Sequence, residues 1–212
     1  MTIDDVSKIV LITLFSAFSV IRAVYYLKVK SAGYRTVIEE RSRYSVWLSI
    51  FICYEVFTFF LYIWFPQTLA WAAFSLPAWS RVLGSVLGIA ALLWFVWIHR
   101  TLGVNHSARL SIKDRQVLIT DGPYRLIRHP MYSAFYLLHI AVFFLTANWF
   151  IGTTWLAGLT ITIALRVRRE EEMLSDRFGE QYDLYSERTG RFVPPVGPGR
   201  ATSRRAQGRT GS

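Results

Sequence analysis

Five blocks of apolar residues, each close to the length of a membrane-spanning helix, constrain this chain more than any other feature. A helix needs about 20 predominantly apolar residues to cross a hydrocarbon core roughly 30 Å thick. The blocks are residues 9–27, 46–65, 82–98, 131–146 and 149–165. Their apolar residues are clustered rather than spread with the periodicity of an amphipathic surface helix. The sequence therefore predicts an all-α, polytopic integral membrane protein with about five transmembrane helices.

The last two blocks are short, and only Ala147 and Asn148 separate them, so we expect a tight helical hairpin. The polar stretch after the last block continues its helix into the cytoplasm as a C-terminal helical segment, with Gly179 as its stop. The first block follows Asp4 and Asp5 and precedes no small-residue cleavage site. We therefore interpret it as a retained helix rather than a secretory signal.

Basic residues fall on alternate connections between the blocks. The connections after the first and third blocks and the segment after the fifth are rich in lysine and arginine, whereas the others hold few cations. Because basic connections stay on the cytoplasmic side, this pattern places the N-terminus outside and the C-terminus in the cytoplasm. The formal net charge of +10 arises at these flanks, where anionic headgroups attract cations, and we expect no nucleic-acid partner.

Composition divides the chain into three parts. Residues 1–79 hold the first two blocks, and residues 80–195 hold the other three with their polar connections. Residues 196–212 have no apolar residue larger than alanine after Val196, so we expect a disordered basic tail. Cys53, the single cysteine, lies inside the second block, which excludes a disulfide framework and a thiolate metal site. We predict no metal.

The densest polar motif comes directly before the fourth block. It reads Gly122-Pro123-Tyr124-Arg125-x-x-Arg128-His129-Pro130-x-Tyr132. Because proline disfavours helical geometry at the preceding residue and suits the first helical position, we expect His129 to cap a helix that begins at Pro130. The free amides of such a helix start attract carboxylate or phosphate. Taken alone, the motif is more typical of a helix start with basic membrane anchors than of an active site.

A second polar motif continues the fifth block. Arg166 and Glu170 lie four residues apart and share one face of the expected helix, followed by Glu171. A solvated helix end carries such pairs as well. The tight hairpin, however, brings the start of the fourth helix beside the end of the fifth. We therefore expect His129 and Tyr132 to meet this pair at the cytoplasmic interface.

Together the two motifs resemble those of the isoprenylcysteine carboxyl methyltransferase and phospholipid methyltransferase superfamily. The second motif reads Arg166-x-x-x-Glu170-Glu171-x-x-Leu174-x-x-x-Phe178-Gly179-x-x-Tyr182-x-x-Tyr185, and Leu102-Gly103-x-Asn105 upstream also fits. The resemblance covers roughly residues 80 to 195. Ala134 departs from it, since many relatives carry glycine there. The resemblance implies an integral membrane enzyme that uses S-adenosylmethionine without the Rossmann fold of soluble methyltransferases.

The resemblance also implies roles for individual residues. The expected cofactor-binding set is Tyr124, Arg128, His129, Pro130, Tyr132, Glu170 and Glu171. The expected catalytic set is Arg166, Glu170 and His129. A guanidinium fork at Arg166 suits an acceptor carboxylate, which needs no base. An acceptor that must lose a proton needs Glu170 or His129.

The acceptor is open at this point. A prenylated cysteine carboxylate, a phospholipid amine, a free fatty or isoprenoid acid and a lipophilic thiol all fit a site that takes lipophilic substrates from the bilayer. O-, N- and S-methylation are therefore alternatives, and the oligomeric state is undetermined. An NADPH-dependent membrane reductase of the steroid-reductase type also uses an Arg-His-Pro-x-Tyr element, but relatives carry an acidic residue soon after the tyrosine, where this chain has Ser133, Ala134 and Phe135. A non-catalytic membrane scaffold is the third alternative.

Two ionisable residues lie inside the apolar blocks. Glu55 belongs to the second block and His139 to the fourth. An ionisable group is costly there, and a functional role is the default expectation. For Glu55, a structural hydrogen bond to a neighbouring helix and a role in substrate access are equally consistent with the sequence.

The charge pattern predicts a measurable topology. With Cys53 replaced by alanine, a cysteine at Ser75 should react with a membrane-impermeant maleimide from outside the cell. A cysteine at Arg109 should react only after the cytoplasmic side is opened. The reverse labelling pattern would contradict the orientation and move both polar motifs to the other face of the membrane.

Overall fold

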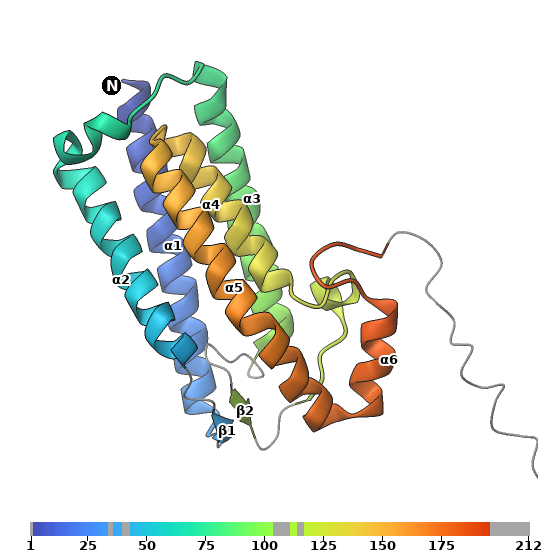
Figure 1. Ribbon diagram of the computed structural model, residues 1–212. Coiled ribbons are helices and arrows are strands. Elements are labelled where there is room, and N and C mark those ends of the chain that lie inside the picture. The colour runs from blue at the N-terminus through green and yellow to red at the C-terminus, as the bar shows by residue number, and fades with distance from the viewer. Residues whose placement is uncertain (1, 34–35, 40–42, 104–110, 114–116, 196–212) are drawn as a thin grey trace, which may run out of the picture.

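The computed structural model describes residues 2–33, 36–39, 43–103, 111–113 and 117–195. Five apolar helices run alongside one another (Figure 1). They are α1 (Ile3–Ser31), α2 (Arg43–Trp64), α3 (Ala78–Leu102), α4 (Pro130–Thr146) and α5 (Trp149–Phe178). By length and composition, four of them can cross a membrane, and α4, with 17 residues, is the shorter fifth. The predicted all-α polytopic fold is confirmed.

The predicted hairpin between α4 and α5 is confirmed, and its turn is built from two residues. Ala147 adopts a left-handed conformation with φ 41° and ends α4. The side-chain oxygen of Asn148 accepts from the backbone N–H of Ile151 at 3.0 Å and so caps α5. The side-chain amide of Asn148 also donates to the Leu69 carbonyl at 2.8 Å. These bonds leave little freedom in how α4 and α5 face each other.

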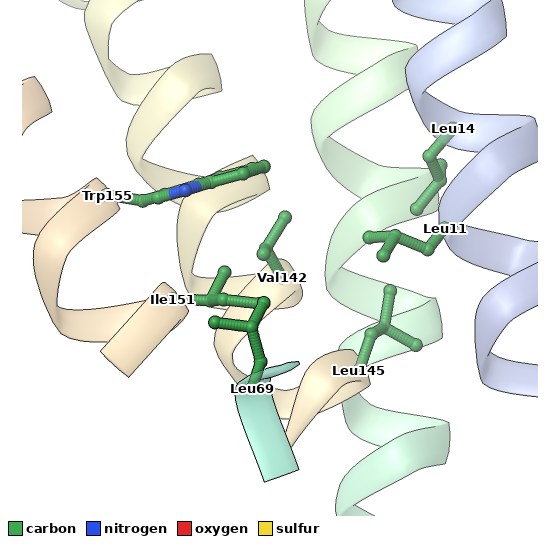
Figure 2. Packing of buried hydrophobic residues seen from close by; sticks show 7 residues of the cluster. All are labelled: Leu11, Leu14, Leu69, Val142, Leu145, Ile151 and Trp155. Carbon is green, nitrogen blue, oxygen red and sulfur yellow. The ribbon is translucent and has the colours of Figure 1, made fainter. Parts of the chain in front are cut away.

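One hydrophobic core joins the helices at the end of the bundle where the chain begins. It draws on α1, α4, α5 and the short helix η1 (Pro66–Ala72), as Figure 2 shows. Its buried residues are Leu11, Leu14, Leu69, Val142, Leu145, Ile151 and Trp155. Trp155 is 1% exposed, and its indole N–H donates to the Thr58 hydroxyl on α2 at 2.9 Å. The core therefore ties the first two helices to the hairpin.

Small residues allow α3 and α4 to pack closely. A Cβ on Gly84 would lie 2.9 Å from the Cβ of Phe144, so a larger residue there would push the helices apart. Ala134, where the resemblance led us to expect glycine, is fully buried against Ala91 and Phe95. Its methyl group is therefore accommodated within the core, and the start of α4 keeps its place against α3.

The other end of the bundle carries the polar motifs. The helix η3 (Gly122–Arg125) leads to α4, which has His129 at its N-cap and Pro130 at its first position, as predicted. Gly179, with φ 52°, ends α5 as predicted, and α6 (Glu180–Arg188) follows at once. The predicted tail at 196–212 lies outside the described residues, as does Asn105. The division of the chain into three parts, with boundaries after residues 79 and 195, stays a prediction.

A small antiparallel sheet was not predicted. It pairs β1 (Thr36–Glu39) with β2 (Ser111–Lys113) and lies at the same end of the bundle as the polar motifs (Figure 1). Strands of three or four residues are too short to show an alternating pattern in the sequence. The sheet joins the connection after α1 to the connection after α3.

Arg81 on α3 joins helices at the end of the bundle opposite the sheet and the polar motifs. Its guanidinium donates to the carbonyls of Phe144 at 2.9 Å and Leu145 at 2.6 Å, near the C-terminus of α4. It also pairs with Asp4 on α1 at 2.8 Å. The Arg81 side chain is 13% exposed and that of Asp4 is 60% exposed. The bonds to α4 are therefore shielded from water, whereas the ion pair is not.

This difference in exposure predicts unequal effects on stability. Arg81→Met should lower the free energy of unfolding by about 1–3 kcal/mol, because two carbonyls at the end of α4 lose their donor. Asp4→Asn should cost less than about 1 kcal/mol, since exposed ion pairs contribute little. Thermal unfolding in a mild detergent measures both variants. If the two variants lose equal free energy of unfolding, the ion pair with Asp4, and not the hydrogen bonds to the α4 carbonyls, stabilises this end.

Candidate active site

The start of α4 and the polar extension of α5 beyond residue 165 meet in one cluster of ionisable side chains. The Tyr132 hydroxyl donates to Oε2 of Glu170 at 2.5 Å, and Nε of Arg166 donates to the same oxygen at 3.1 Å. Nε2 of His129 lies 3.1 Å from Oε1 of Glu171. The hairpin thus brings together the residues that the two motifs were expected to contribute.

Glu171 lies at the centre of a network of cations. Its Oε1 accepts from Nε of Arg128 at 3.3 Å and from Nε of Arg191 at 3.0 Å. Its Oε2 accepts from Nη2 of Arg191. Burial alone would raise the pKa of Glu171, but hydrogen bonds from His129 and Arg191 and the charge of Arg128 outweigh it and lower the pKa to about 2. An ionised carboxylate only accepts, so Nε2 of His129 carries the hydrogen in this contact.

A strap formed by residues 190–193 crosses the start of α4. The backbone N–H groups of Arg128 and His129 donate to the carbonyls of Gly190 at 2.8 Å and Arg191 at 3.1 Å. The ring of Phe192 lies 5.9 Å from that of His129. In Figure 1 the strap, in red, returns from α6 toward η3. The strap satisfies the amides of Arg128 and His129, so neither is available to an anion, and anion binding at the start of α4 stays a prediction.

Arg128 fastens the strap to α6. Its Nη1 donates to the Ser186 carbonyl at 2.6 Å and also to the Thr189 carbonyl. With its bonds to Glu171, this side chain is fully engaged by the protein, and 14% of it is exposed. Arg128 therefore shapes the site by holding its wall, and it has little hydrogen-bonding capacity left for a small ligand.

Tyrosines form the wall on the α6 side. The Tyr185 hydroxyl donates to the Tyr124 carbonyl at 2.7 Å. Tyr182 is 4% exposed, and its hydroxyl has no hydrogen-bond partner within the part of the chain that the structure describes. Burial, with the nearby charge of Glu171, raises the pKa of Tyr182, so this hydroxyl stays neutral. A buried hydroxyl without a partner is costly, which makes it a position that a ligand can satisfy.

Two of the predicted residues contribute mainly through their backbone and packing. Pro130 is buried, and its carbonyl accepts from the Trp94 indole at 3.1 Å. The ring of Tyr124 packs beside the core cluster that contains Phe95 and Ala134. The prediction missed the strap residues Arg191 and Phe192. The only hint in the sequence was a cation and a large aromatic residue after the last predicted helix.

A cavity of about 420 Å³ lies between η3 and α6. Its lining residues are Thr120, Arg125, Gln181, Leu184, Tyr185, Arg188 and Thr189. None of them belongs to the predicted site, and the cavity adjoins the carboxylate cluster through Tyr185 and Thr189. We assign the chemistry to the cluster rather than to the cavity, because only the cluster holds carboxylates that can balance a cationic ligand. Among the described residues, no group of histidine, cysteine or acidic side chains is arranged to hold a metal.

A family match covers the first motif, the hairpin and the second motif as far as Leu174. Residues 82–176 match the model of the isoprenylcysteine carboxyl methyltransferase (ICMT) family. This segment is similar to the ICMT family. The resemblance that the motifs predicted is therefore confirmed, and it covers the start of α4, the turn and the polar extension of α5.

Curated relatives of this chain match over part of their length. A probable protein-S-isoprenylcysteine O-methyltransferase of Oryza sativa subsp. indica is 30% identical over 89 residues, which are 42% of this chain and 47% of that protein. The methanethiol S-methyltransferase of Pseudomonas deceptionensis is 28% identical over 144 residues, which are 59% of this chain and 53% of that protein. The chain thus spans about half the length of the curated relatives it matches.

A solved structure shows that the fold extends beyond the matched segment. The eukaryotic intramembrane Ras methyltransferase ICMT aligns with 87% of this chain and 67% of its own, with a TM-score of 0.52 and 21% sequence identity. The likeness identifies an ICMT-like polytopic membrane fold. Together with the long apolar helices, it makes this chain an integral, multi-pass membrane protein.

The lowered pKa of Glu171 predicts how acid affects the cluster. The carboxylate binds fewer protons in the folded state than in the unfolded one, so its stabilisation is present above its usual value of 4.5 and is lost as pH falls toward about 2. Glu171→Gln should therefore unfold at a lower temperature than the parent near neutral pH. The gap in melting temperature should narrow as the pH falls from about 5 to about 2.

Glu172→Gln is the matched control for this measurement. Glu172 is the next residue on α5, is 44% exposed and pairs only with Arg168 and Arg169 among the described residues. Its substitution should change the melting temperature much less, because exposed pairs are weak. If the difference in melting temperature between Glu171→Gln and the parent stays constant with pH, the lost stability comes from packing and not from the ionised carboxylate.

Proposed function

We propose that this protein is an S-adenosylmethionine-dependent membrane methyltransferase. It transfers a methyl group to a lipophilic acceptor at the cytoplasmic face of the membrane, with its N-terminus outside. The observation that carries the proposal is the meeting of His129, Tyr132, Arg166 and Glu170 in a segment similar to the ICMT family. Relatives that match the chain are named as methyltransferases.

Glu170 is the residue best suited to the cofactor's ammonium group. Burial raises the pKa of Glu170, but the charge of Arg166 and the hydrogen bonds from Tyr132 and Arg166 hold it below its usual value, so the carboxyl is ionised. Both of its hydrogen bonds go to Oε2, and Oε1 accepts none from the described residues. Glu171, in contrast, is already neutralised by its arginines. We therefore assign Glu170 to the ligand and Glu171 to holding His129 and the strap.

Aromatic rings beside Glu170 suit the rest of the cofactor. The rings of His129 and Tyr132 stack with centroids 5.4 Å apart, and Phe192 lies against both. Aromatic faces attract a cation such as a sulfonium, and the Tyr182 hydroxyl offers a hydrogen bond. When bound, S-adenosylmethionine supplies a methyl group whose bond to sulfur breaks as the bond to the acceptor forms, and the electron pair stays on the sulfur. The protein's task is alignment and exclusion of water, which the strap supports.

Arg166 is the residue best placed to orient an acceptor carboxylate. Its side chain is 12% exposed, is held by Glu170 and lies over the Tyr132 ring at 6.0 Å. A guanidinium is the side chain best suited to bind a carboxylate, which supports O-methylation. The proposal therefore favours an isoprenylcysteine carboxyl methyltransferase-like reaction.

S-methylation of a thiol is the second candidate. The methanethiol S-methyltransferase matches 59% of this chain, against 42% for the rice O-methyltransferase. A thiol must lose its proton, so a base is required. Because Nε2 of His129 donates to Glu171, Nδ1 is the nitrogen of His129 that can accept a proton, and Glu170 is the other base in the cluster.

The decisive measurement is which labelled cofactor the purified protein retains. We expect S-adenosylmethionine to bind and Glu170→Gln to weaken it by about 1.5–3 kcal/mol, the contribution of a charge-assisted hydrogen bond. Glu172→Gln, at an exposed position two residues away, should bind like the parent. Retention of NADPH instead would favour the reductase, and retention of neither would favour a scaffold.

A further inference from the structure

The cavity between η3 and α6 is lined by two cations. Arg125 ends η3 and Arg188 ends α6, and both residues line the cavity, whose volume is about 420 Å³. None of its lining residues, all within the described part of the chain, is acidic. Neither arginine forms an ion pair with a described residue. Two guanidiniums without a carboxylate are suited to an anion, and phosphate fits best because their planar forks bind its oxygens bidentately.

Other side chains of the lining suit the same kind of ligand. Thr120, Thr189 and Gln181 bring side chains that can donate a hydrogen bond to an anion. Leu184 adds an apolar surface on the face of α6 that carries Arg188. Sites for small molecules have volumes of about 300–1,000 Å³, so this cavity can hold more than a single phosphate group. Its chemistry fits an amphiphile with an anionic head.

The helix α6 presents different faces to this cavity and to the carboxylate cluster. Gln181, Leu184 and Arg188 lie three and four residues apart, so they share the face that lines the cavity. Tyr182 lies on another face, is buried and has the charge of Glu171 nearby. The cluster, with its carboxylates, suits a cation, whereas the cavity suits an anion. The two sites therefore take different ligands.

The cavity lies at the level where the chain enters the membrane. The backbone N–H of Arg128 donates to the Gly190 carbonyl at 2.8 Å, so the end of α6 lies beside the start of the apolar helix α4 (Figure 1). Trp97 on α3 lies beside η3, since a Cβ on Gly122 would be 3.4 Å from its indole nitrogen. The Trp97 side chain is exposed, and exposed tryptophans favour the interface between membrane and water.

Exposed apolar side chains accompany the two cations. Leu126, directly after Arg125, is 39% exposed, Leu184 is 42% exposed, and Val193 in the strap is 69% exposed. A dissolved phosphate ion makes no use of such side chains. A phospholipid uses both features, because its phosphate meets the arginines while its apolar part stays beside the leucines. The occupant that fits this cavity is therefore a lipid headgroup.

We propose that the cavity binds the phosphate of an anionic phospholipid, held by Arg125 and Arg188, with Leu184 beside the glycerol region. Basic residues at the membrane surface attract anionic headgroups, and a cavity lined by two of them makes this attraction specific. The bound phosphate joins η3 to α6, as does the hydrogen bond from Tyr185 to the Tyr124 carbonyl. The lipid thereby fastens the α6 side of the candidate active site to the membrane surface. This role does not depend on the proposed methyltransferase function.

Lipid binding to the purified full-length protein tests the inference. In a neutral detergent, the protein is titrated with dioleoylphosphatidylglycerol or dioleoylphosphatidylcholine, and bound lipid is counted by native mass spectrometry. We expect phosphatidylglycerol to bind at least about tenfold more tightly, because the choline group of the other lipid finds no acidic partner in the cavity. Inorganic phosphate should displace it no better than chloride at the same ionic strength, since phosphate lacks the apolar part.

Two double variants test the arginines. Arg125→Gln with Arg188→Gln should weaken phosphatidylglycerol binding at least about tenfold, because charge-assisted hydrogen bonds are lost. The matched control, Arg168→Gln with Arg169→Gln, removes the same charge from the polar extension of α5, where the two side chains are 88% and 50% exposed. This control should bind the lipid like the parent. Arg188→Gln alone should weaken binding several-fold, so the test stands even if the double variant does not fold.

Three results would overturn the inference. Equal binding of the two lipids by the parent would exclude a site for an anionic headgroup. Equal losses in the two double variants would show that the basic surface as a whole attracts the lipid. Displacement by phosphate beyond the chloride control would assign the cavity to free phosphate. None of these results bears on the proposed function, because binding is measured without methyl transfer.

Discussion

The partly buried carboxylate of Glu171 makes the interactions on which the polar end of this protein depends. It gathers Arg128, His129 and Arg191, which come from the start of α4 and from the chain beyond α6. A carboxylate removed from water needs such partners, and each partner is in turn immobilised by it. His129 is thereby fixed in one tautomer, and the strap is held across the start of α4. The candidate site is rigid because one charge orders several segments.

Inside the membrane part of the bundle the same constraint applies to every polar side chain. Glu55 is paired with His139, and Arg81 covers the carbonyls at the end of α4. Where water is absent, a polar group finds a partner within the protein or raises the free energy of the fold. These pairs join neighbouring helices, α2 to α4 and α3 to α4, so they hold the bundle together where water is absent.

Local rules explain which parts of the site were predictable. A two-residue connection between apolar helices permits only a tight hairpin, so Ala147 and Asn148 already imply that the two motifs meet. Proline after His129 sets the start of α4. The strap was not predictable, because its contacts join residues about 60 positions apart, as in the bond from Arg128 to the Thr189 carbonyl. No local pattern marks Arg191 or Phe192 as neighbours of the motif.

The sequence by itself determined the helical membrane fold, the hairpin and the meeting of the two motifs at its polar end, because apolar block length and turn length act locally. The tertiary structure decided which of their residues bind one another. Only the folded chain shows that arginines surround Glu171, that the hydrogen bonds of Glu170 leave its Oε1 without a partner among the described residues, and that Glu55 meets His139. Such assignments depend on distances between segments that the covalent chain leaves free.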